Sequence, residues 1–161
     1  MSEALNIATP ECTPVLDRLE RARETGLWPN GRRDLWADAM GVILLLSLYR
    51  DLGEERYLRE AEWVALEVDR ILGRRRGIRI ADRPDANGQS VRSQALWIFA
   101  LHRLGQFIFP FQARSLSLVR EIHAPFVRPG EGIISRRDET RTRPCPGSGA
   151  GKLEVFLGLS V

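Results

Sequence analysis

Cysteine and histidine are scarce in this sequence, which contains two of each. Cys12 and Cys145 lie far apart, and neither has a second Cys or His at the spacing of zinc ligands. This excludes a zinc knuckle and predicts two free thiols in a reducing compartment. The sequence also lacks a Gly-rich phosphate loop, a dinucleotide fingerprint and any metal motif, so we expect neither a cofactor nor a bound metal.

Long apolar segments are missing as well. The longest, residues 39–49, is interrupted by a serine, whereas a helix that spans a bilayer needs about 20 apolar residues. The N-terminal residues lack the basic start and apolar core of a secretory signal. With 43% hydrophobic and 28% charged residues, the composition is typical of a soluble globular protein. We therefore expect a cytoplasmic protein with no membrane partner.

Lysine is almost absent, since Lys152 is the one lysine among 24 basic residues. The arginines reflect either a coding bias or an anion-binding surface, because guanidinium groups suit carboxylates and phosphates. Acidic residues are interspersed with them and no nucleic-acid-binding motif accompanies them, so we do not expect a nucleic-acid partner. We interpret the clusters as solvated loops, with some arginines lining a cavity. They are Arg32–Arg33, Arg74–Arg76 with Arg79 and Arg83, and Arg136–Arg137 with Arg141 and Arg143.

Apolar residues recur at spacings of three and four, which predicts an all-α protein. The expected helices are 15–24, 34–51, 55–72, 92–105 and 111–124, the last ended by Pro125. Helices 34–51 and 92–105 have almost no polar face, which is typical of helices that are covered on all sides. Helices 55–72 and 111–124 are amphipathic. The pattern therefore alternates inner and outer helices.

The helical hairpins repeat about every 53 residues. Residues 48–53 match 101–105 with one deletion, and Gly77-Ile78 matches Gly132-Ile133. A third copy begins at residues 157–161, inside an apolar stretch that has no cap. Because helical repeats bury their faces against neighbours, we expect either a fragment or self-association through this C-terminal helix.

The alternating inner and outer helices and the sequence of the repeats resemble the α/α toroid enzymes, in particular the six-hairpin glycosidase-like group. That group includes unsaturated glucuronyl hydrolases, N-acylglucosamine 2-epimerases and uncharacterised bacterial proteins. The resemblance covers residues 15–161 and is carried by segments 34–41, 48–53, 57–61 and 84–89. It implies a partial toroid, because a complete one has twelve helices. We expect a flexible tail over residues 1–13 and an incomplete toroid of about two and a half hairpins over residues 14–161.

In such a toroid the loops that lead into the inner helices face the central cavity, where carboxylates can act as general acid and base on a sugar. The candidate catalytic residues are Asp34, Asp38, Asp85 and Glu154. For Asp34 the sequence favours a cap or first-turn residue that stabilises its helix, over catalysis or contact with a sugar hydroxyl. Asp38 interrupts an apolar helix, so its carboxylate must face either a cavity or an arginine. Asp85 also fits a simple turn, and Glu154 lies in an apolar stretch.

The candidate substrate-binding residues are Trp28, Trp36, Gln89 and Arg92. The two tryptophans could stack on sugar rings, whereas Trp63 and Trp97 suit helix packing better. Gln89 precedes an inner helix and could hold a sugar hydroxyl. Arg92 would suit an acidic sugar, or it marks a copy that has lost activity. The sequence thus predicts a carbohydrate-active protein, hydrolase-like or epimerase-like, with a small carbohydrate ligand. A helical-repeat scaffold without catalysis, or a truncated remnant, is the alternative.

Overall fold

The described part of the chain folds into five α-helices. The computed structural model describes residues 12–29, 31–83, 88–128 and 132–137. The helices are α1 (Thr13–Glu24), α2 (Leu35–Leu52), α3 (Glu55–Leu72), α4 (Val91–Gly105) and α5 (Pro110–Phe126). The prediction of an all-α fold is confirmed. The described residues contain no helix that is long and apolar enough to cross a membrane.

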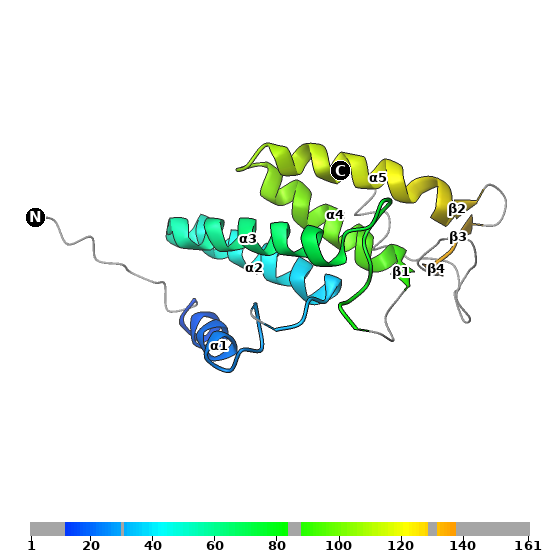
Figure 1. The fold of residues 1–161 in the computed structure, drawn as a ribbon. Helices are drawn as coiled ribbons and strands as arrows, with labels where there is room; N and C mark the ends of the chain where they lie inside the picture. Colours follow the sequence, from blue (N-terminus) through cyan, green and yellow to red (C-terminus); the bar gives the residue numbers. More distant parts are fainter. Residues whose placement is uncertain (1–11, 30, 84–87, 129–131, 138–161) are drawn as a thin grey trace, which may run out of the picture.

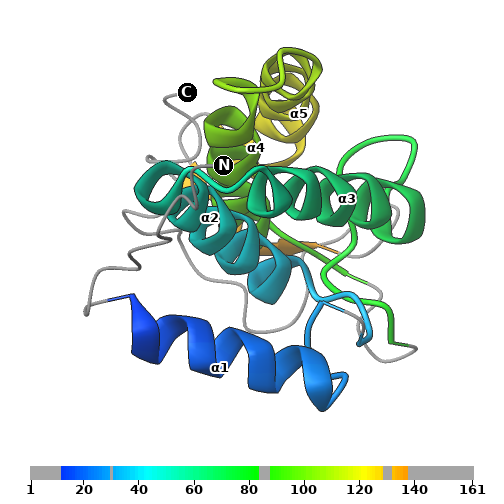
Figure 2. The ribbon, with the colours of Figure 1, turned by 90° about the vertical axis from the view of Figure 1, so that its left-hand side faces the viewer.

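The helices form two antiparallel hairpins that pack through their first helices (Figures 1 and 2). Helix α3 lies against α2, α5 lies against α4, and α2 packs on α4. The hydrophobic core is formed mainly where these helices meet, and it includes Val42, Leu45, Val64, Ile98 and Leu118. Helices α2 and α4 are therefore the inner pair and α3 and α5 the outer pair, as the apolar patterns predict.

Local chemistry fixes the ends of α2. The side chain of Asp34 accepts hydrogen bonds from the backbone N–H groups of Trp36 and Ala37, which otherwise have no partner at a helix start. At the other end Gly53 adopts a left-handed conformation with φ of 70°, which an L side chain rarely tolerates. The turn to α3 is short for this reason.

Three predicted details of α1, α3 and α5 differ from the structure. Helix α1 begins at Thr13 and includes Pro14 in its first turn, where a missing N–H costs nothing. Pro125 does not end α5, which continues to Phe126. Only one late backbone bond is lost there, and Phe126 is fully buried. Trp63, expected to pack between helices, is 43% exposed.

Among the residues that the structure describes, four two-residue strands lie in the loops, and the apolar pattern does not predict them. They are β1 (Gln89–Ser90), β2 (Val127–Arg128), β3 (Gly132–Ile133) and β4 (Arg136–Arg137). Strand β1 pairs with β4, and β2 pairs with β3. An equivalent isolated bridge joins Gly73 to Ile78 after α3. The chain thus turns back in the same way after each outer helix.

The two hairpins share a further backbone bond at the start of each inner helix. In the first hairpin, Leu35 N–H donates to Ile80 O at 2.8 Å. In the second, Val91 N–H donates to Ser135 O at 3.0 Å. The first turn of each inner helix is therefore hydrogen-bonded to the loop that follows the outer helix of the same hairpin. This equivalence confirms the repeat in three dimensions.

Helix α1 lies below the two hairpins in Figures 1 and 2. It contributes one buried residue, Leu19, to the core. An ion pair between Arg23 and Glu60 connects it to α3. This attachment is slight compared with the packing between the hairpins.

Candidate functional site

The N-terminal ends of α2 and α4 carry most of the residues predicted to act on a sugar. The two ends are connected by Arg92, whose guanidinium carbon lies 4.8 Å from the centroid of the Trp36 ring. Each helix is capped by its own side chain, Asp34 for α2 and Ser90 for α4. The structure thus brings the two inner-helix starts into one neighbourhood.

Asp38 is fully buried, and three groups surround its carboxylate. Trp28 Nε1 donates to Oδ1 at 2.9 Å, and the backbone N–H of Asp34 donates to Oδ2 at 3.1 Å. Arg33 Nη1 lies 3.2 Å from Oδ1 and forms an ion pair that falls short of hydrogen-bond geometry. Of the two surroundings expected for Asp38, a cavity or an arginine, the structure has the arginine.

Burial raises the pKa of Asp38 above its ordinary value of 3.8, because the charged form loses its hydration. The hydrogen bond from Trp28, the charge of Arg33 and the Asp34 N–H oppose this shift but do not cancel it. A carboxyl with a raised pKa suits general acid chemistry in an open site. Here the side chain has no exposed surface and its oxygens hold protein donors, so it has no access to a ligand.

Trp28 lies against the middle of α2. A Cβ atom added to Gly41 would lie 2.0 Å from Trp28 Cζ2, so the glycine makes the space for the indole ring. Together with the hydrogen bond to Asp38, this contact fixes Trp28 as a packing residue that connects the turn after α1 to α2. The neighbouring Trp28–Pro29 peptide bond is cis. As a sugar platform, Trp28 offers far less free surface than its place in a turn suggests.

Trp36 and Arg92 are the two predicted binding residues that remain accessible. Trp36 is 37% exposed, and Arg92 is exposed beside it. Arg92 also has a further contact within the chain, so Trp36 is not its only partner. The pair therefore places a partly exposed indole ring and a positive charge within a few ångströms of each other.

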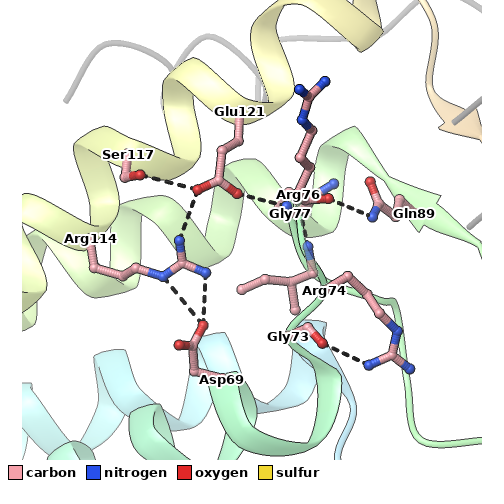
Figure 3. Close-up of polar contacts among 11 residues, drawn as sticks. Asp69, Gly73, Arg74, Arg76, Gly77, Gln89, Arg114, Ser117 and Glu121 are labelled. Carbon is pink, nitrogen blue, oxygen red and sulfur yellow. Dashed lines mark hydrogen bonds and ion pairs between the residues drawn. The ribbon is translucent and has the colours of Figure 1, made fainter. Parts of the chain in front are cut away.

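Gln89 is buried, and its Nε2 donates to the backbone O of Arg76 at 3.0 Å (Figure 3). It holds the loop after α3 and has no exposed surface for a sugar hydroxyl. Asp34 is the N-cap described above. Asp85 and Glu154, and the C-terminal helix expected to mediate self-association, lie outside the described residues.

Arg33 and Arg137 belong to the arginine clusters that the sequence predicts to be solvated loops with some arginines lining a cavity, but both are buried. Arg33 pairs with Asp38 and also lies 5.8 Å from the centroid of the Trp63 ring. Arg137 donates to the backbone O of Pro125. The sequence signal for Arg33 was the lone carboxylate of Asp38 in an apolar helix, which required a cationic partner nearby.

Glu121 of α5 binds the loop that follows α3, at Gly77 (Figure 3). Its carboxylate accepts from Gly77 N at 2.7 Å, from Ser117 Oγ at 3.1 Å and from Arg114 Nη1 at 3.0 Å. Arg114 in turn bonds Asp69 of α3 at 2.9 Å. This network connects the two outer helices. Over the part of the chain that the structure describes, no cluster of His, Cys, Asp or Glu could hold a metal ion.

Comparison with known proteins shows the fold. No protein-family model and no curated protein matches this sequence. Among solved structures, the chain is similar to the crystal structure of D-mannose isomerase, with a TM-score of 0.61 and 17% sequence identity. The similarity covers 86% of this chain but 39% of that chain, so this sequence spans about two fifths of the neighbour's length.

The helical hairpins of this chain therefore share their fold with part of that structure, whereas membership in the six-hairpin glycosidase-like group stays a prediction. The more specific kinship to glucuronyl hydrolases or N-acylglucosamine 2-epimerases stays a prediction. The identity is too low to carry residue roles from one protein to the other.

Proposed function

We propose that this chain forms part of a carbohydrate-handling α/α toroid and binds an acidic sugar at the start of its inner helices. Two observations support the proposal. The fold is similar to that of D-mannose isomerase, a protein named for its action on a sugar. The exposed pair of Trp36 and Arg92 lies at the N-terminal ends of α2 and α4.

The Trp36–Arg92 pair is the observation that carries this proposal. The partly exposed indole of Trp36 suits contact with the apolar face of a sugar ring. The positive charge of the Arg92 guanidinium beside that ring attracts a carboxylate. A uronic acid presents both features, so we expect it to bind better than the neutral sugar of the same ring.

The geometry favours binding over catalysis by Asp34 or Asp38. Asp34 accepts two backbone hydrogen bonds as a helix cap, and Asp38 is buried among Trp28, Arg33 and the Asp34 N–H. Hydrolase-like or epimerase-like chemistry by carboxylates would therefore depend on other residues, with Asp85 and Glu154 as the remaining predicted candidates. A non-catalytic binding protein is the function that these contacts support best.

The test is a titration of the full chain with glucuronate and with glucose, followed by NMR of the four indole N–H groups. We expect glucuronate to shift the Trp36 signal and to bind about fivefold more tightly than glucose, the preference that one exposed charge pair supplies. Arg92→Gln should remove the preference, and Trp36→Leu should weaken both sugars.

Two matched controls separate the site from general surface effects. Trp63→Leu removes a tryptophan of similar exposure from outer helix α3, and Arg50→Gln removes an exposed arginine from the far end of α2. Neither should alter the titration. Equal affinity for the two sugars, or equal losses in the control and test variants, would contradict the proposal.

A further inference from the structure

A pocket of about 330 Å³ opens between the two outer helices, away from the start of the inner helices. Helices α3 and α5 form its sides, and the middle of α4 forms its floor. The pocket follows from the fold, because the outer helices of a toroid lie on a wider circle than the inner ones. Neighbouring outer helices therefore diverge, and here the Asp69–Arg114 ion pair spans the gap at 2.9 Å.

The wall of this outer pocket is largely apolar. Its apolar lining residues are Ala65, Leu66, Trp97, Leu101, Ile108, Pro110 and Phe111. Trp97 is fully buried beneath it, whereas Leu66 is 57% exposed at its edge. A volume of this size lies at the lower end of the range for small-molecule sites, roughly 300–1,000 Å³. The pocket thus fits a compact ligand with an apolar body.

The charged residues that line the pocket favour one sign of charge on the ligand. They are Glu62, Asp69 and Arg114. Arg114 is fully engaged, since Nε and Nη2 bond Asp69 and Nη1 bonds Glu121. Glu62 makes no hydrogen bond or ion pair with any residue of the described chain. The lining therefore has one uncompensated negative charge, beside the aromatic rings of Trp97 and Phe111, which also favour a cation.

We propose that this outer pocket binds a small hydrophobic ammonium ion. Glu62 supplies the opposite charge, and the apolar wall between α3 and α5 covers the ligand's body. The site does not depend on the sugar site at Trp36 and Arg92, which lies at the ends of other helices. One of the two proposals can therefore fail while the other holds.

The experiment compares phenethylammonium with 2-phenylethanol, which has nearly the same shape but no charge. Each is titrated into the full chain by isothermal calorimetry, with the Trp97 indole signal followed by NMR. We expect both probes to shift Trp97, and the ammonium to bind about fivefold more tightly than the alcohol. Glu62→Gln should make the two affinities equal while leaving that of the alcohol unchanged.

Two further variants keep the test decisive. Glu67→Gln removes the same charge from α3 at a residue that pairs with Arg70 outside the pocket, and it should preserve the preference. Leu66→Trp narrows the pocket at an exposed position and should weaken both probes. Equal affinity of the native chain for both probes, an unshifted Trp97, or an equal effect of Glu62→Gln and Glu67→Gln would overturn the proposal.

Discussion

Replacing Asp38 by alanine removes the acceptor that three groups share at the start of α2. Trp28 Nε1 and the Asp34 N–H would each lose a partner, and the guanidinium of Arg33, which is 3% exposed, would lose its counter-charge. An unsatisfied buried donor costs about 1–3 kcal/mol, and breaking a buried ion pair costs about 3–5 kcal/mol. These terms overlap, so we expect the free energy of unfolding to fall by about 3–5 kcal/mol.

The measurement is urea unfolding followed by circular dichroism at neutral pH. The midpoint should fall while the slope with urea stays constant, because the surface exposed on unfolding hardly changes. Asp51→Ala is the matched control, since Asp51 pairs with Arg50 on the exposed surface of the same helix. It should have little measurable effect.

A double variant tests whether the buried charge is the cause. Combining Asp38→Leu with Arg33→Met replaces both partners by apolar groups, which often restores the stability lost on breaking a buried pair. We expect the double variant to be more stable than Asp38→Leu alone by about 2 kcal/mol. If Asp38→Ala instead leaves stability unchanged or raises it, as often happens at catalytic positions, the structural role assigned to Asp38 is wrong.

Two more predictions concern the same helix. Gly41→Ala should destabilise the chain by about 1–3 kcal/mol, because the new methyl group overlaps the Trp28 ring, and the tryptophan emission should shift as that ring moves. Burial raises the pKa of Asp38, so its contribution to stability is largest below the ordinary value of 3.8 and is lost as pH rises through the raised value. In urea titrations at a series of pH values, the difference in free energy of unfolding between the native chain and Asp38→Asn should therefore become smaller as the pH rises from below 3.8 through the raised pKa of Asp38. A difference that becomes larger as the pH rises would contradict the assignment.

The helices could be predicted because each has a long run of apolar residues at helical spacing. Helix α3 has the bounds that its apolar spacing indicates. The short strands have no such run, since two residues cannot show an alternating pattern, and their pairing depends on where the hairpins place them. Trp63 could not be placed either, because its exposure depends on which neighbour covers that face of α3.

The sequence indicates which residues lie near the starts of the inner helices, but it only partly indicates which of them are buried and what they contact. Asp38 was identified as a group that needed a partner, but its place in a helix did not distinguish a ligand cavity from an arginine. The contact between Trp28 and Gly41 is tertiary, and the one hint in the sequence was a glycine inside an apolar helix. Gln89 and Trp36 both lie close to inner-helix starts, yet local sequence does not indicate that one is buried and the other exposed.

Hydrogen bonds between the hairpins make the loop of the first hairpin depend on the second. The segment that returns from α3 is fixed through Gly77 and Ile78, whose N–H groups donate to Glu121 and Gln94 of the second hairpin. The first hairpin thus depends on its successor to order its own loop. A first hairpin cut out of the chain would keep its two helices but lose these acceptors. The smallest unit of this fold with all its loop hydrogen bonds therefore extends beyond one sequence repeat into the next hairpin.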